Sequence, residues 1–169
     1  MPLTSSLGIS VSSELTQAAG LGTGSVKSNL TGSVSLASGT GAGKADKVYQ
    51  GRRTLAASAS EDLDLAGVLL DAFGSAITFV RVKGLFIKAS AGNTNNVVVG
   101  AASSNQWATL LNTTGTITLR PGTSLGVVAG AADAIGYAVT ASTGDLLKVA
   151  NSSSGTSVTY DICIIGASA

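Results

Sequence analysis

From Lys47 onward the sequence is a succession of short apolar runs, rich in β-branched residues and separated by turn residues. Many short strands at regular spacing, with no long amphipathic helical period, are typical of a β-sandwich or barrel. We therefore predict an all-β chain in which residues 46–169 form an antiparallel β-sandwich that follows an extended N-terminal arm. The runs expected to form strands cover residues 48–56, 61–65, 77–88, 97–100, 107–111, 116–120, 125–129, 137–141, 146–150 and 158–165.

The longest of these runs, residues 77–88, changes its apolar phase at a glycine. Val80 and Val82 share one face before Gly84, whereas Leu85 and Ile87 carry the apolar phase beyond it. A slip of one residue at a glycine is typical of a β-bulge, in which one strand carries an extra residue. The sequence therefore predicts a bulge at this position.

Residues 1–45 differ from the remainder of the chain. They are rich in Ser, Thr and Gly, contain no aromatic side chain, and carry only scattered aliphatic residues. Such a segment cannot bury enough apolar area to fold alone. We predict an arm with one strand, over residues 30–36, that lies on a neighbouring protein. The residues expected to make that contact are the aliphatic ones at its start: Leu3, Leu7, Ile9, Val11 and Leu15.

Charged residues form only 11% of the chain, and the formal net charge is +1. Ordinary soluble domains carry about 25% charged residues, so the low value favours a surface that faces other protein. A near-neutral chain lacks the positive surface that attracts nucleic acid or an anionic membrane, and we expect neither partner. We interpret the adjacent basic pair Arg52 and Arg53 as part of a strand surface rather than a phosphate site.

The sequence also lacks the side chains that most enzymes need. It contains no histidine and one cysteine, which excludes a Ser-His-Asp or Cys-His arrangement and disfavours a zinc site. The one carboxylate cluster contains Glu61, Asp62 and Asp64. We interpret Asp62 and Asp64 as the solvated face of a strand, with a catalytic pair or a calcium site as the alternatives. We expect no enzymatic activity, no catalytic residue, no cofactor and no metal.

Tryptophan and cysteine each occur once in the sequence. Trp107 follows the polar Asn105 and Gln106, so it is compatible with a ligand contact at a loop edge, an interface anchor or core packing. Cys163 lies in a strand-like apolar run. We interpret it as a small buried side chain, because a reactive thiol needs a base or a cation beside it.

Several phrases of the sequence resemble small virion proteins of tailed bacteriophages, most of all head decoration or cement proteins. The resemblance covers residues 44–166, and its phrases are structural rather than chemical. It implies a β-sandwich of jelly-roll type, self-association as a homotrimer or another ring, and binding to the major capsid protein. No individual binding residue carries over. The phrases are residues 52–57 (RRTLAA), 61–67 (EDLDLAG), 71–74 (DAFG), 77–79 (ITF), 92–100 (GNTNNVVVG) and 151–161 (NSSSGTSVTYD).

These observations lead to a hypothesis for the function. The chain is expected to be a structural virion protein, made in the host cytoplasm, that binds the outer surface of a phage capsid and stabilises it by bridging capsid subunits. Repeated weak contacts would add through avidity. The alternative is a tail or fibre component with a host-surface-binding β-sandwich, for which Trp107 would be the first residue to test.

Overall fold

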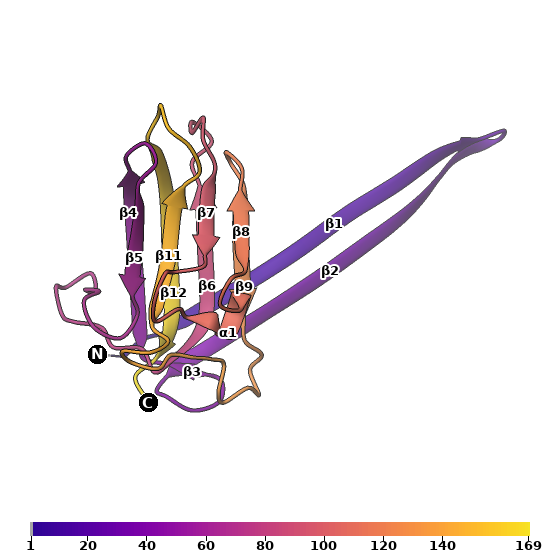
Figure 1. The fold of residues 1–169 in the computed structure, drawn as a ribbon. Helices are drawn as coiled ribbons and strands as arrows, with labels where there is room; N and C mark the ends of the chain where they lie inside the picture. Colours follow the sequence, from indigo (N-terminus) through magenta and orange to yellow (C-terminus); the bar gives the residue numbers. More distant parts are fainter. Residues whose placement is uncertain (1) are drawn as a thin grey trace.

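The computed structural model describes residues 2–169 and consists mainly of β-strands (Figure 1). The predicted all-β class is confirmed. None of the helices in the described part of the chain is long and apolar enough to cross a membrane. The elements are β1 (Ser5–Ala19), β2 (Gly22–Ser38), β3 (Lys44–Ala45), β4 (Lys47–Leu55), β5 (Ser60–Asp64), β6 (Arg81–Ala89), β7 (Val97–Gly100), α1 (Ala108–Leu111), β8 (Thr116–Leu119), β9 (Ser124–Val128), β10 (Tyr137–Ala138), β11 (Leu146–Asn151) and β12 (Val158–Ala167).

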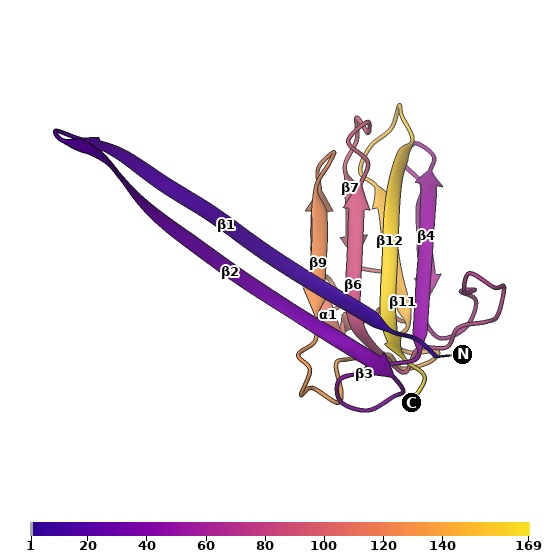
Figure 2. The same cartoon turned by 180° about the vertical axis from the view of Figure 1, so that it is seen from behind.

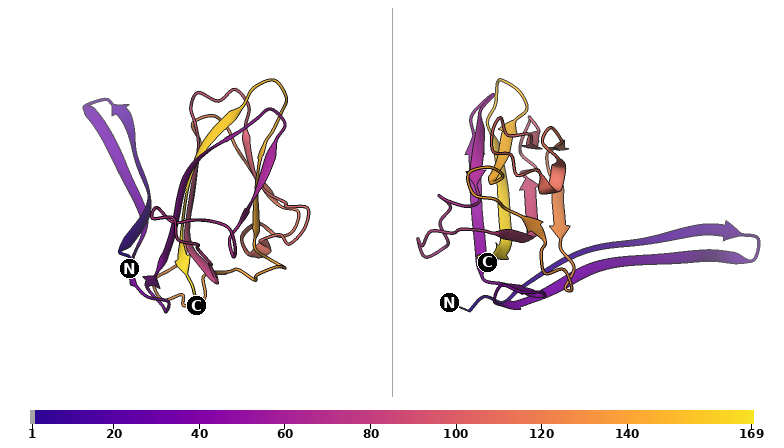
Figure 3. Two further views of the ribbon diagram at one scale, coloured as in Figure 1. Left: turned by 90° about the vertical axis from the view of Figure 1, so that its left-hand side faces the viewer. Right: turned by 60° about the horizontal axis from the view of Figure 1, so that its bottom comes forward.

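Two antiparallel sheets make up the body of the molecule. In one, β12 lies between β4 and β6, and the far edge of β6 pairs with both β9 and β10. The other has the order β5-β11-β7-β8. The two sheets face each other in the side view (Figure 3) and share one hydrophobic core, an arrangement compatible with a β-sandwich.

The alternation of side chains along the strands explains this packing. In β12, Val158, Tyr160, Ile162 and Ile164 are buried between the sheets, while the residues between them face outward. Successive side chains of a strand point to opposite faces, so an alternating sequence supplies one apolar face. Burying each large aliphatic side chain contributes about 1.5–3 kcal/mol.

The predicted bulge lies in β6, where it is paired with β12. Ile165 lies opposite Gly84 and Gly166 opposite Val82, so Lys83 is the extra residue. The Lys83 side chain is buried and its ammonium group donates to the carbonyl of Asp133. The bulge thus turns Gly84 to the outer face of the sheet.

Some predicted strands are absent or shorter. Residues 108–111 form the short helix α1 instead of a strand, and the run at 137–141 contributes only β10. Asn105 and Asn112, which flank this helix, have φ angles of 47° and 62°. Positive φ angles before and after this segment interrupt an extended chain.

The largest difference from the sequence-based prediction concerns the N-terminal segment. One strand was expected there, over residues 30–36, but β1 and β2 form an antiparallel hairpin that pairs continuously from Ser5–Leu36 to Ala19–Gly22. We refer to residues 5–38 as the hairpin. It leaves one end of the body and projects diagonally far beyond it (Figures 1 and 2).

Candidate assembly interface

The hairpin has one apolar and one polar face. Every large aliphatic residue of β1 and β2 lies on the same face, because those of β1 occupy odd positions and pair with even positions of β2. The opposite face carries Ser, Thr and Asn, together with Glu14 and Lys27, whose charged groups lie 3.8 Å apart. The apolar face consists of Leu7, Ile9, Val11 and Leu15 from β1 and Val26, Leu30, Val34 and Leu36 from β2.

The root of the hairpin packs on the outer face of the β4-β12-β6-β9 sheet. Val34 and Leu36 are buried there in a small core with Ile165 of β12. The side chains of Leu7 and Ile9 lie over glycines: a Cβ at Gly84 would be 3.1 Å from Leu7 Cδ1, and one at Gly126 would be 3.1 Å from Ile9 Cδ1. Two glycines on the outer face therefore let the hairpin approach closely.

Beyond the root, the apolar face is open to solvent. The exposed fraction rises from 57% at Val11 to 75% at Leu15, and Val26 and Leu30 on β2 are similarly exposed. An isolated two-stranded hairpin is marginally stable in water, and a contiguous exposed apolar patch commonly marks an interaction site. We therefore regard the face formed by Val11, Leu15, Val26 and Leu30 as the first candidate interface, the distal apolar face.

A loop on the body supplies a second apolar surface. Between β5 and β6 the chain turns at Asp71, whose carboxylate accepts hydrogen bonds of 2.9 Å from the N–H groups of Phe73 and Ser75. The turn directs Phe73 outward, where 79% of the residue is exposed, and Val68 and Leu70 are also exposed. We call Val68, Leu70 and Phe73 the loop patch.

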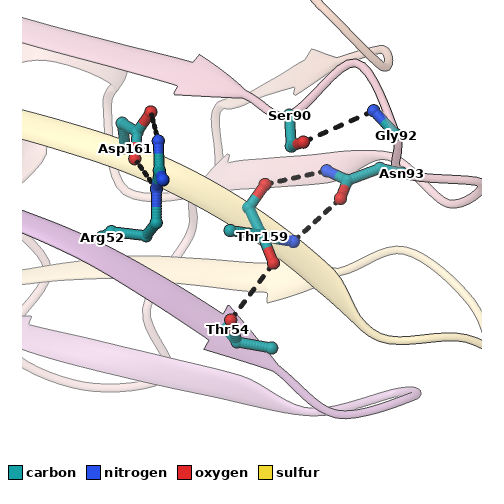
Figure 4. Close-up of polar contacts among 7 residues, drawn as sticks. All are labelled: Arg52, Thr54, Ser90, Gly92, Asn93, Thr159 and Asp161. Carbon is teal, nitrogen blue, oxygen red and sulfur yellow. Dashed lines mark hydrogen bonds and ion pairs between the residues drawn. The ribbon is translucent and has the colours of Figure 1, made fainter.

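Polar side chains on β4, β12 and the loop after β6 contact one another on the outer face of the body (Figure 4). Arg52 of β4 forms two bonds, of 2.6 and 3.0 Å, to Asp161 of β12. The hydrogen bond from Arg52 holds the pKa of the Asp161 carboxyl below its ordinary value. Asn93 donates to the Thr159 carbonyl at 2.9 Å and accepts from the Thr159 N–H at 2.8 Å, which fastens its loop to the end of β12.

The two adjacent arginines point to opposite faces of β4 and both are paired with carboxylates. Arg53 bonds Glu61 of the facing sheet, and the buried Tyr160 hydroxyl donates to the other Glu61 oxygen at 2.8 Å. Burial and this hydrogen bond raise the pKa of Tyr160. These contacts tie the two sheets together and give Arg52 and Arg53 a structural role.

The predicted arm residues divide into two groups. Leu3 and Leu7 pack at the root against the body and Ile9 lies over Gly126 at the margin of the root, whereas Val11 and Leu15 lie farther out on the hairpin. The sequence contained a signal for the apolar face, because Leu7, Ile9, Val11 and Leu15 all fall on odd positions. The alternation within one strand does not give the register between β1 and β2, so the sequence did not indicate that the aliphatic residues of β2 complete the same face.

Trp107 belongs to the core. It is 4% exposed, its indole N–H donates to the Ala138 carbonyl at 2.9 Å, and its ring meets Tyr137 edge-on at 6.3 Å. Of the three roles open from sequence, core packing fits this position. An interface or ligand contact through the ring would require the ring to be exposed.

The remaining predicted residues lie on separate parts of the body. Asp64 accepts from the Ala66 N–H at 2.9 Å where β5 ends, and Asp62 lies opposite Lys148. Within residues 2–169 no group of three or more acidic, histidine or cysteine side chains could hold a metal ion. Cys163 is half-buried on the outer face near the hairpin root, and burial raises the pKa of its thiol.

Comparisons with protein-family models, with curated proteins and with solved structures give no match. The function must therefore be inferred from the chain's own surfaces, and two of these, the distal apolar face and the loop patch, have the character of protein interfaces.

Proposed function

We propose that this chain is a non-enzymatic structural virion protein that binds the outer surface of a phage capsid and bridges its subunits. The observation that carries the proposal is the hairpin, an amphipathic ribbon that extends from the body with its apolar face uncovered. A strand the length of β1 reaches about 50 Å. Such a reach serves contact with a neighbour rather than the packing of the chain's own core.

The loop patch gives the molecule a second, separate attachment surface. In Figure 1 the loop that contains Phe73 leaves the body on the side opposite the hairpin tip. A protein with one apolar surface can bind one partner, but two separated surfaces allow one molecule to hold two neighbours together. Weak contacts of this kind gain strength through avidity when many copies occupy one shell.

The proposed fold is a jelly roll, the eight-stranded double sheet of many viral capsid domains. The strand order supports it. The chain passes back and forth between a sheet that contains β4, β6, β9 and β12 and one that contains β5, β7, β8 and β11, with β7 and β8 consecutive in the second sheet. The last strand returns between β4 and β6. A homotrimer, implied by the resemblance to decoration proteins, is part of the proposal, and native mass spectrometry of the purified protein tests it.

Copy number in purified particles is the decisive measurement. Quantitative mass spectrometry against the major capsid protein should find hundreds of copies per particle, retained in tail-free heads. A few copies that disappear with the tails would overturn the capsid assignment and favour the tail or fibre function. Antibody labelling of intact heads should then place the chain on the outer surface.

A further inference from the structure

We propose that the free edge of β9 and the distal apolar face beside it bind an exposed edge strand of the capsid protein, so that this strand extends the β4-β12-β6-β9 sheet beneath the hairpin. The inference rests on the proposed function, because it names the part of the capsid protein that the hairpin would hold. The hairpin keeps its contact with the capsid, and the body supplies the second wall of the same site.

The hydrogen bonds between β9 and β6 show which backbone groups of β9 are already used. In an antiparallel pair, alternate residues direct their N–H and C=O groups toward the neighbouring strand, and the residues between them direct theirs away. The N–H of Ala129 donates to the Lys83 carbonyl at 2.8 Å, and the Thr123 carbonyl accepts from the Ala89 N–H at 3.0 Å. The odd-numbered residues along β9 therefore bond to β6.

The even-numbered residues of β9 form a free edge. Ser124, Gly126 and Val128 direct their backbone groups away from β6, and within residues 2–169 β9 pairs with no other strand. Exposed edges are commonly protected by a charged residue or a proline, and β9 contains neither. An extended segment of a partner can add to such an edge as one more strand.

The hairpin crosses the sheet in a way that covers the position of this added strand. Leu7 lies over Gly84 of β6, and Ile9, two residues farther along β1, lies over Gly126 of β9. Two residues span about 6.7 Å and neighbouring strands lie about 4.8 Å apart, so a diagonal hairpin advances by about one strand for every two residues. Val11, the next residue of the same face, thus falls beyond β9. Figure 2 shows β9 at the margin of the body, with the hairpin continuing past it.

The exposed side chains indicate the chemistry of the partner strand. Val11 pairs with Leu30 across the hairpin, and 57% and 69% of these residues are exposed. The charged residues of the hairpin, Glu14 and Lys27, lie on its opposite face and pair with each other. The site therefore fits an uncharged strand that presents aliphatic side chains to the distal apolar face and backbone groups to β9.

The combined contact is modest in area. The distal apolar face offers about 30 Å of a ribbon roughly 10 Å wide, and with the edge of β9 it would bury roughly 900 Å² in total. Stable complexes bury about 1,200–2,000 Å². A single site should therefore bind weakly, and attachment to a shell should depend on many copies acting together.

Hydrogen exchange at individual amides tests the strand pairing. The full chain is bound to heads that lack it, exchanged in deuterated buffer, released and measured by NMR. The amides of Ser124, Gly126 and Val128 should exchange at least roughly ten-fold more slowly on heads than in the free chain, because each would donate to the added strand. The amides of Ser60 and Asp62, which face the free edge of β5 in the other sheet, are the matched control and should not change.

Two pairs of variants test the two walls of the site. Ser124→Lys places a charge at the edge of β9, and its control Ser60→Lys places one at the edge of β5. Val11→Glu places a carboxylate on the distal apolar face, and its control Ser12→Glu places one on the polar face. Ser124→Lys and Val11→Glu should each weaken the affinity for heads roughly ten-fold, and the controls should leave it unchanged. Fluorescence of the buried Trp107 reports whether the body remains folded.

The results separate this inference from the proposed function. A chain that binds heads without protection at the edge of β9, or equal affinities of Ser124→Lys and Ser60→Lys, would overturn the strand pairing while leaving capsid binding intact. Protection that appears in the free protein as its concentration rises would identify a second copy as the partner and would also overturn it. Absence of the chain from purified heads would refute the proposed function and this inference together.

Discussion

The hairpin and the body share an alternating sequence pattern, but the apolar face of the hairpin is exposed beyond its root and that of the body is buried. Leu15 on β1 and Ile87 on β6 both occupy the apolar phase of an alternating strand, yet Leu15 is largely exposed and Ile87 is fully buried. The difference lies in what covers each face, because the β6 sheet has a second sheet across the core and the hairpin has none beyond its root. Alternation thus specifies a strand with an apolar face, but the partner for that face can belong to another molecule.

The largest expected effect contrasts the two faces directly. Ile87→Ala should lower the free energy of unfolding by about 2–5 kcal/mol, because it leaves a cavity in a packed core. Leu15→Ala should change it by less than about 0.5 kcal/mol in the free protein. Urea unfolding followed by Trp107 fluorescence measures both. Similar losses for the two variants would mean that the distal apolar face is covered within the monomer.

The next prediction concerns the boundary between the two regions, at Gly84. Gly84→Ala should cost about 1–3 kcal/mol, because the added methyl group would press on Leu7 and displace the hairpin root. Limited proteolysis should then cut residues 5–38 faster than in the wild type. Gly130→Ala is the control, since no atom lies within 4 Å of its added Cβ. Unchanged proteolysis of Gly84→Ala would show that Leu7 does not anchor the hairpin.

The loop patch provides a milder test, on binding rather than folding. Phe73→Ser should weaken the affinity for capsid shells roughly ten-fold, or about 1.4 kcal/mol, with little change in stability because the side chain is exposed. Ile135→Ser, on another loop and similarly exposed, is the control. Co-sedimentation with heads that lack the protein measures both affinities. An equal loss of affinity in the two variants would show that the loop patch is not a specific capsid contact.

The smallest expected effect is a loss of folding stability at acidic pH, which arises from two aspartates of the body. Hydrogen bonds from Arg52 lower the pKa of Asp161, and those from the N–H groups of Gly136 and Ile135 lower that of Asp133. Folded-state pKa values below the unfolded values contribute stability above the ordinary aspartate pKa, and this is lost as pH falls through the lowered values. Stability should therefore decline below about pH 4.

Arg52→Gln should make that decline shallower, because Asp161 would then titrate nearly as it does in the unfolded chain. Arg120→Gln, at an exposed arginine that makes no ion pair within residues 2–169, should leave the decline unchanged. Denaturant titrations from pH 6 to pH 2 compare the slopes. Identical slopes for wild type and Arg52→Gln would exclude the Asp161 contribution.

The sequence predicted the body more closely than the hairpin, for a physical reason. Strands such as β11 and β12 carry their alternation and turn signals locally, and the phase change at Gly84 located the bulge. The pairing of β1 with β2 was harder to foresee, because their aliphatic residues are diluted by serine and threonine and their common face emerges only from the register. The helix at α1 was missed because the chain changes direction at two asparagines with positive φ, Asn105 and Asn112, which the periodicity of the sequence does not reveal.

The central place of β12 in its sheet also bears on how the chain folds. The residues of β4 and β6 that pair with β12 precede it by about 70 to 120 positions, so neither strand can complete its hydrogen bonding until β12 has been synthesised. Contacts between such distant segments form slowly, and unpaired strands are prone to aggregate meanwhile. The hairpin, by contrast, joins neighbouring segments and can pair early. A nascent chain would thus expose the apolar face of its hairpin before the two sheets of its body are complete. The timing of assembly would then depend on the synthesis of the ten residues of β12.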